Sequence, residues 1–159
     1  MFTLRDVIEM AIQIEKNGEK VYRMALEKVS DLSLVSLLQH LADEEVRHIQ
    51  WFSELEKKAE TSVDDPHVEK AGKSLLQQIL GNQSFSLSDA DLSNMQGIEA
   101  LLTTAIEFER DTALFYEMVQ SFVQDQEVSN QLDTIIKEEH QHARDLEKFL
   151  DDTFSKAKT

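Results

Sequence analysis

The chain has 159 residues, of which 41% are apolar, and it contains a single proline and no cysteine. This composition predicts one mostly helical domain over residues 1–159, and it excludes disulfides, thiolate metal sites and a cysteine nucleophile. The formal net charge of -15 argues against nucleic acid and anionic membranes as partners. The sequence shows no signal peptide and no apolar run of membrane-spanning length, so we expect a cytoplasmic protein.

Apolar residues recur at helical spacing in two segments of the first half of the chain. The first predicted helix covers residues 4–28, with Thr3 as its N-cap and Asp6 as the partner in a capping box. After the turn "SD", the segment "LSLVSLLQHLADEEVRHIQWFSELEKKAE" predicts a second helix. The two helices are expected to form an antiparallel hairpin.

The second half of the chain repeats this pattern after a long connection. Residues 60–92 form the connection, with one short helical piece near Val68 to Leu80. A third helix is predicted from Asn94 to Val123 and a fourth from Val128 to Thr153, with the turn "QDQE" between them. Apolar residues of the connection give a candidate homodimer interface: Leu75, Leu76, Ile79, Leu80 and Phe85.

A constant offset of 94 residues superimposes the two hairpins without a gap. The offset places Glu15 on Glu109, Tyr22 on Tyr116, Glu45 on Glu139 and His48 on His142. The chain is therefore predicted to be a duplicated helical hairpin, and the duplication preserves charged and polar residues as well as the apolar stripe.

Helix geometry brings the repeated glutamates and histidines together. Glu15 and Glu45 lie 15 positions on either side of Ser30, so two antiparallel helices with a rise of ~1.5 Å per residue place them at the same height. The same count holds in the second hairpin. Glu45 and His48 are about 60° apart on one helix and can both face one centre. Since apolar residues flank them, we expect one buried layer of four glutamates and two histidines.

Such a layer is not stable as bare ions, because desolvation and mutual repulsion would force proton uptake or water entry. Two divalent cations would balance the charge of four carboxylates, and neutral imidazoles would add ligands without charge. A Glu from each of two helices with a Glu-x-x-His from each of the other two is the ligand pattern of di-iron carboxylate bundles. The sequence therefore predicts a dimetal site.

At these residues the sequence resembles the rubrerythrin-like branch of the ferritin-like superfamily. The resemblance covers nearly the whole chain and is carried by "IEKNGEKVY", "DEEVRHIQWF", "IEFERDTALFY" and "KEEHQHARDL". It implies an all-α fold, a ferritin-like four-helix bundle made of two helical hairpins joined by a long crossover connection. It also implies six metal ligands: Glu15, Glu45, His48, Glu109, Glu139 and His142. Glu45 and Glu139 would bridge the two ions, and Tyr22 and Tyr116 would donate hydrogen bonds to ligands.

The sequence departs from that family in two respects. Full-length rubrerythrins carry a cysteine-ligated iron of the rubredoxin type, whereas this sequence has no cysteine, so an external electron donor protein is expected. Thr112 stands where the family places a further carboxylate, three residues after the ligand of the third helix. The second departure speaks against a peroxidase cycle in which iron shifts between ligands.

The resemblance implies a non-haem dimetal carboxylate protein that acts as an oxidoreductase on O2 or hydrogen peroxide. Two alternatives stay open: a ferroxidase or iron-handling protein, and a non-catalytic helical module with structural metals. Two iron ions are the expected cofactor, although manganese and zinc accept the same oxygen and nitrogen ligands.

Other ionisable residues are expected to be solvated. Glu44 and Glu138 precede ligands but point about 100° away on the helix, so they are predicted to be solvated or to support the ligands. Ordinary surface positions are predicted for His40, His67, His140, Glu19 and Glu107.

Overall fold

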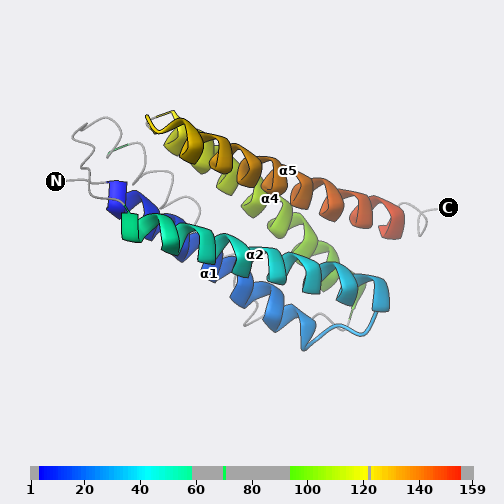
Figure 1. Cartoon of the computed structure of the whole chain (residues 1–159). Coiled ribbons are helices and arrows are strands. Elements are labelled where there is room, and N and C mark those ends of the chain that lie inside the picture. The colour runs from blue at the N-terminus through cyan, green and yellow to red at the C-terminus, as the bar shows by residue number, and fades with distance from the viewer. Residues whose placement is uncertain (1–3, 59–69, 71–93, 122, 155–159) are drawn as a thin grey trace.

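The computed structural model describes residues 4–58, 70, 94–121 and 123–154. Its helices are α1 (Leu4–Leu26), α2 (Leu32–Lys58), α4 (Met95–Gln120) and α5 (Gln126–Phe154). Figure 1 shows α1 beside α2 and α4 beside α5, with the two hairpins packed against each other. The predicted all-α bundle of two helical hairpins is confirmed.

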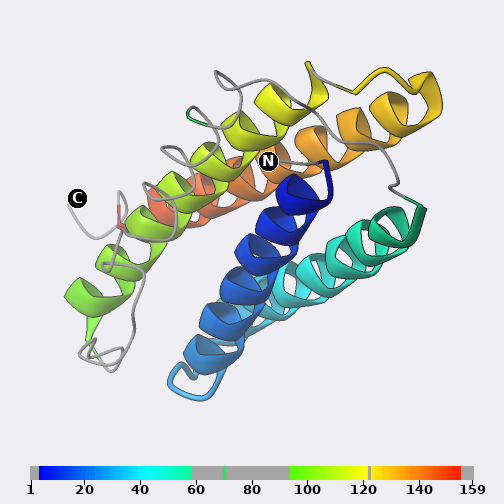
Figure 2. The ribbon, with the colours of Figure 1, turned by 90° about the vertical axis from the view of Figure 1, so that its left-hand side faces the viewer.

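The long crossover is confirmed by where its neighbouring helices end and begin. Figures 1 and 2 show that α2 ends at one end of the bundle and α4 begins at the opposite end, so the connection joins opposite ends. Apart from Lys70, the short helix predicted near Val68 to Leu80 and the apolar residues predicted for a homodimer interface lie outside the described residues.

Short polar side chains begin three of the helices. The Asp31 carboxylate accepts a hydrogen bond from the Leu34 backbone N–H at 2.9 Å, and Asn94 accepts one from the Gly97 N–H at 2.8 Å. Asp125 accepts from the N–H groups of Glu127 and Val128 at the start of α5. Each cap satisfies donors that have no partner within the first helical turn. Asp31 and Asp125 are related by the same offset as the glutamates, so the duplication includes these caps.

These caps and the turns correct the predicted helix ends. The first helix ends at Leu26 rather than at residue 28, where the Lys28 N–H bonds the Ala25 carbonyl in a turn. The third helix ends at Gln120 instead of Val123. The fourth begins at Gln126 and not at Val128, since Asp125 caps it and shortens the predicted "QDQE" turn. Thr3, the predicted cap of the first helix, lies outside the described residues.

The core of the bundle is apolar except for one layer. Its largest fully buried side chains are Tyr22, Tyr116 and Phe115, and leucines and isoleucines of all four helices pack around them. The buried polar residues are Glu15, Glu45, His48, Glu109, Thr112, Glu139 and His142. Burying a carboxylate without a compensating partner is costly, so this layer requires hydrogen bonds, ion pairs or metal ions. No helix in the described ranges combines the length and the hydropathy needed to cross a membrane.

Candidate metal centre

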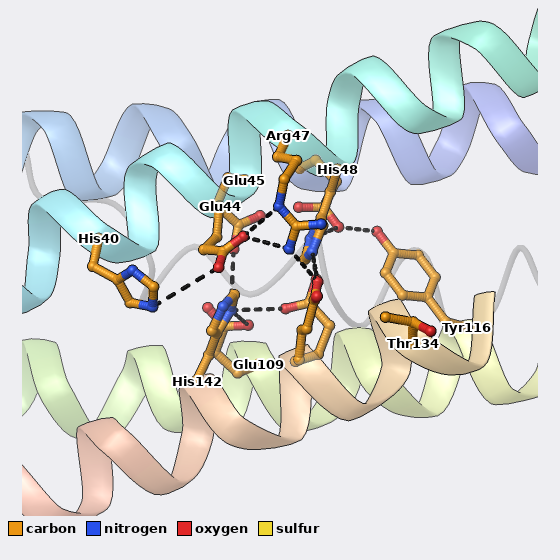
Figure 3. Close-up of polar contacts among 12 residues, drawn as sticks. His40, Glu44, Glu45, Arg47, His48, Glu109, Tyr116, Thr134 and His142 are labelled. Carbon is orange, nitrogen blue, oxygen red and sulfur yellow. Dashed lines mark hydrogen bonds and ion pairs between the residues drawn. The ribbon is translucent and has the colours of Figure 1, made fainter. Parts of the chain in front are cut away.

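All four helices contribute to the polar layer. Glu15 comes from α1, Glu45 and His48 from α2, Glu109 from α4, and Glu139 and His142 from α5. Every one of the six is at most 2% exposed. Figure 3 shows Glu45, His48, Glu109 and His142 converging in the space between the hairpins, as the helical spacing predicted. The structure therefore brings all six predicted ligands together.

The six residues form two overlapping groups. One group consists of Glu15, Glu45, His48 and Glu139, and the other of Glu45, Glu109, Glu139 and His142. In each group the potential ligand atoms lie within 4.8 Å of one another. Glu45 and Glu139 belong to both groups. Two carboxylates shared between two adjacent sites, each completed by one Glu and one His, can hold a pair of cations with bridging ligands.

The distribution of unpartnered atoms tests whether metal ions fit the layer. In the described part of the chain, nine buried side-chain atoms have no hydrogen-bond partner, and eight of these belong to the six residues. Glu45 and Glu139 leave both carboxylate oxygens without a partner, whereas Glu15 and Glu109 leave one each. His48 and His142 each leave Nδ1. Because buried polar atoms are normally hydrogen-bonded, this concentration indicates atoms placed for cations.

The neighbouring carboxylates do not form hydrogen bonds with the histidine Nδ1 atoms. The His48 Nδ1 atom lies 2.9 Å from a Glu139 oxygen and 3.4 Å from a Glu15 oxygen, but neither contact has hydrogen-bond geometry. His142 Nδ1 lies 3.3 Å from Glu139 and 3.5 Å from Glu109. The two imidazole rings are stacked with their centroids 5.9 Å apart. Both Nδ1 atoms thus face the shared carboxylates from the same side.

The two tyrosines bond across the hairpins. The Tyr22 hydroxyl donates to Glu109 and the Tyr116 hydroxyl donates to Glu15, both at 2.5 Å. Each bond holds the one oxygen of that glutamate which is not left for a cation. The sequence spacing predicted donors to ligands, but it did not show that each tyrosine would serve the opposite hairpin. Burial and the neighbouring carboxylates raise the pKa of both phenols well above the usual value, so they remain donors.

Without cations, the carboxylates of the layer divide into two kinds. Burial and repulsion by the other glutamates raise the pKa of Glu45 and Glu139 well above the usual value. Burial also opposes ionisation of Glu15, but contacts with Glu45 and His48 outweigh it and lower the pKa of Glu15 to about 2. The pKa of Glu109 is lowered in the same way by Glu139 and His142. The two shared carboxyl groups therefore favour the protonated form more than an exposed glutamate does, and a cation would displace such protons.

The histidines supply the opposite charge in the metal-free layer. Burial by itself would lower the pKa of His48, yet its contacts with Glu138, Glu139 and Glu15 raise the pKa to about 12. The pKa of His142 is raised to about 10, chiefly by Glu109 and Glu139 acting against burial. The raised pKa values of the two histidines and of the two shared carboxyl groups favour bound protons, which offset the charge of the other carboxylates. Cation binding is therefore expected to release protons from the layer.

Glu138 and Arg47 orient the His48 imidazole from outside the layer. The outer nitrogen of His48, Nε2, lies 2.7 Å from a Glu138 oxygen, and Arg47 donates to the same oxygen at 2.5 Å. Arg47 also donates to Glu44 through Nε at 2.7 Å. His40 Nε2 lies 4.0 Å from Glu44. A carboxylate on the outer nitrogen fixes the tautomer that leaves Nδ1 free for a metal. Glu138 is thus half-buried and supports a ligand, one of the two roles predicted for it.

Gly18 has a role in the layer that the sequence reasoning missed. A Cβ atom at this position would lie 3.1 Å from the Glu45 carboxylate and 3.1 Å from the Phe108 ring. A larger residue would crowd both groups, so the glycine gives the carboxylate room beside the α1 backbone. Its counterpart in the duplication is Thr112, which is 1% exposed and whose hydroxyl has no partner among the described residues. A glycine in mid-helix, three residues after Glu15, was the available signal for this close approach.

The remaining surface predictions have mixed outcomes. His40 and Glu107 are exposed, as predicted. His140 is half-buried and contacts Glu117 at 3.0 Å. Glu19 is half-buried rather than exposed. His67 lies outside the described residues.

Comparison with known proteins supplies one match. The family model described as rubrerythrin matches residues 6–150, which include all four helices except their outermost ends and all six residues of the layer. No curated protein and no solved structure gives a significant match.

Proposed function

We propose a function for this chain, which belongs to the rubrerythrin family. The protein binds two iron ions in the buried layer and acts as an oxidoreductase that reduces O2 or hydrogen peroxide. The residues that would hold the ions are Glu15, Glu45, His48, Glu109, Glu139 and His142. Electrons would come from an external donor protein, because the chain has no cysteine with which to ligate a second type of iron centre.

The single observation that carries this proposal is the pattern of unpartnered atoms. Both oxygens are free in the two glutamates shared by the groups, one oxygen is free in each unshared glutamate, and one nitrogen is free in each histidine. A pair of divalent cations uses such a set fully, with Glu45 and Glu139 as bridges. Four carboxylates also match the charge of two divalent cations, so the loaded layer needs no protons.

The chain's own residues give such a centre its reactivity. Iron supplies electrons by cycling between the +2 and +3 states. Tyr22 and Tyr116 hold the outer oxygens of Glu109 and Glu15, so these two glutamates keep one oxygen directed at the centre. Glu138 holds the outer nitrogen of His48. The burial of the layer limits bulk water, which strengthens the electrostatic interactions inside it.

The test is anaerobic reconstitution with Fe2+ followed by mixing with hydrogen peroxide or O2. We expect about two ions per chain and an oxidation rate well above that of free Fe2+ in the same buffer. The matched variants are Glu139→Ala, which removes a shared ligand of α5, and Glu107→Ala, which removes an exposed carboxylate of α4. Only Glu139→Ala should lower the oxidation rate to that of free Fe2+. Oxidation no faster than that of free iron would contradict the proposal, and release of Fe3+ after each turnover would favour iron handling instead.

A further inference from the structure

A groove lies between α2 and α5 directly beside the polar layer. Its volume is about 530 Å³, and Arg47, His48, Trp51, Gln131, Thr134 and Ile135 are among its lining residues. Three acidic residues, Glu54, Asp125 and Glu127, also line it and are exposed. The buried His48 and Ile135 form its inner wall. The volume is many times that of a water molecule, about 30 Å³, so small solutes and water fit together in the groove.

His48 is the boundary between this groove and the polar layer. Its Nδ1 atom faces the carboxylates of Glu15 and Glu139, whereas its outer nitrogen bonds Glu138. Arg47 covers the same carboxylate from the solvent side. The Arg47 side chain is 52% exposed, and exposed side chains change rotamer rapidly, whereas that of Glu138 is 28% exposed. A solute in the groove is therefore separated from the layer by one imidazole and one movable ion pair.

Among the described residues, the duplication gives the other histidine different surroundings. The counterpart of Thr134 is His40, whose ring meets the His142 ring edge-on with centroids 6.2 Å apart. The counterpart of Gln131 is Leu37, which packs against the core. Figure 3 shows His40 and Thr134 at opposite ends of the imidazole pair. A bulky imidazole thus lies beside His142 where a small hydroxyl lies near His48.

We propose that this groove admits small neutral oxygen ligands, of the size of O2 or hydrogen peroxide, to the metal position held by His48, and that the position held by His142 is shielded. The proposal rests on the proposed function. The ligand class follows from charge: the three acidic residues of the groove and the net charge of -15 disfavour anions, whereas neutral molecules are unaffected. The Arg47 guanidinium, Gln131 amide and Thr134 hydroxyl can hydrogen-bond a peroxide.

The experiment uses nitric oxide as a neutral probe of Fe2+ in the reconstituted, oxygen-free protein. Two matched variants place the same bulk at duplicated positions: Thr134→Phe narrows the groove, and His40→Phe replaces one ring with another beside His142. Both positions are exposed, and neither belongs to the predicted ligand set. Iron content is measured first, and the rate of nitrosyl formation is then followed by absorbance. We expect Thr134→Phe to slow binding about tenfold and His40→Phe to change it less than about twofold.

The possible outcomes separate this inference from the proposed function. A wild-type chain that does not retain about two ions contradicts the proposed function itself. A wild type that retains them, but binds nitric oxide as fast as Thr134→Phe does, overturns the groove inference and leaves the proposed function standing. A larger effect of His40→Phe would overturn it as well. If Thr134→Phe loses iron, Thr134→Leu provides the same comparison with a smaller side chain and the same expected direction.

Discussion

The two hairpins carry identical residues at the ligand and tyrosine positions of the layer, and they differ at several positions around it. Inside, the offset relates every Glu, His and Tyr of the layer to an identical residue, and the two tyrosine bonds are reciprocal. Outside, His40 corresponds to Thr134 and Arg47 to Gln141. The matched interior indicates one chemical demand that both halves must meet. The unmatched exterior is the basis of the proposed difference in access between the two metal positions.

Among these variants, loss of a shared carboxylate should have the largest effect on metal content. Glu45→Ala and Glu139→Ala each remove an oxygen ligand from both positions at once, so metal content should fall from about two ions per chain towards zero. The two variants should behave alike because the duplication makes them equivalent. Metal analysis after dialysis measures the effect, and Glu107→Ala provides an exposed-carboxylate control. Retention of one full ion in either variant would argue against bridging.

Removal of one imidazole should have half that effect. His48→Ala and His142→Ala each take a ligand from one position, so about one ion per chain should remain tightly bound. The remaining ion should differ between the two variants in ligand access, since only one position adjoins the groove. Isothermal titration with Co2+ and its absorption spectrum would show this. Equal loss of both ions would mean that the positions fold and bind only as a unit.

Glu138 and Glu44, the carboxylates outside the layer, should differ in their effect on metal affinity. Glu138→Gln weakens the hold on the His48 ring and should lower metal affinity by about 10- to 100-fold. Glu44→Gln, its counterpart, should cost less, because Glu44 lies 4.0 Å from the His40 imidazole, beyond hydrogen-bonding distance, whereas Glu138 lies 2.7 Å from that of His48. Competition with a chelator of known affinity measures both. An equal loss in the two variants would contradict the asymmetry.

The metal-free chain should lose stability as pH rises. The pKa values of His48 and His142, about 12 and about 10, lie above the ordinary 6.5, so these groups stabilise the fold fully below pH 6.5. Above that pH the unfolded chain loses protons that the folded chain keeps, and each such proton lowers the free energy of unfolding by about 1.4 kcal/mol per pH unit. The raised pKa values of Glu45 and Glu139 act in the same direction above pH 4.5.

Thermal unfolding at pH 6.5 and 8.5 measures this slope. The loaded protein should show a much smaller decrease, because cations replace the protons, and its metal affinity should rise with pH. A metal-free chain that becomes more stable over the same interval would show that the histidines are neutral in the folded state.

The smallest effect is expected from the tyrosines. Tyr22→Phe and Tyr116→Phe each remove a hydrogen bond to a buried carboxylate, which should destabilise the fold by about 1.5–3 kcal/mol and leave metal content near two ions. Because the bonds are reciprocal, the two variants should cost similar amounts. Urea unfolding of both variants measures whether the two losses of unfolding free energy are equal. A cost below about 0.5 kcal/mol in either would show that its phenol does not hold the ligand.

The sequence predicted the layer because helical spacing and the offset depend only on residue order. Both place Glu45 and His48 on one stripe, and opposite Glu15, before any packing is known. The pairing of each tyrosine with the opposite hairpin depends on how the hairpins pack, which periodicity within one helix does not contain. The contact between Arg47 and Glu138 has the same origin. The helix ends were displaced by two or three residues, since Asp125 could be assigned either to the turn or to the cap.

Anomalous diffraction at the iron edge, from crystals of the reconstituted protein, tests the dimetal centre most directly. Two peaks are predicted between the Glu45 and Glu139 carboxylates, one beside Nδ1 of His48 and the other beside Nδ1 of His142. Peaks elsewhere on this acidic chain, or a layer without anomalous density in protein that retains iron, would contradict the account.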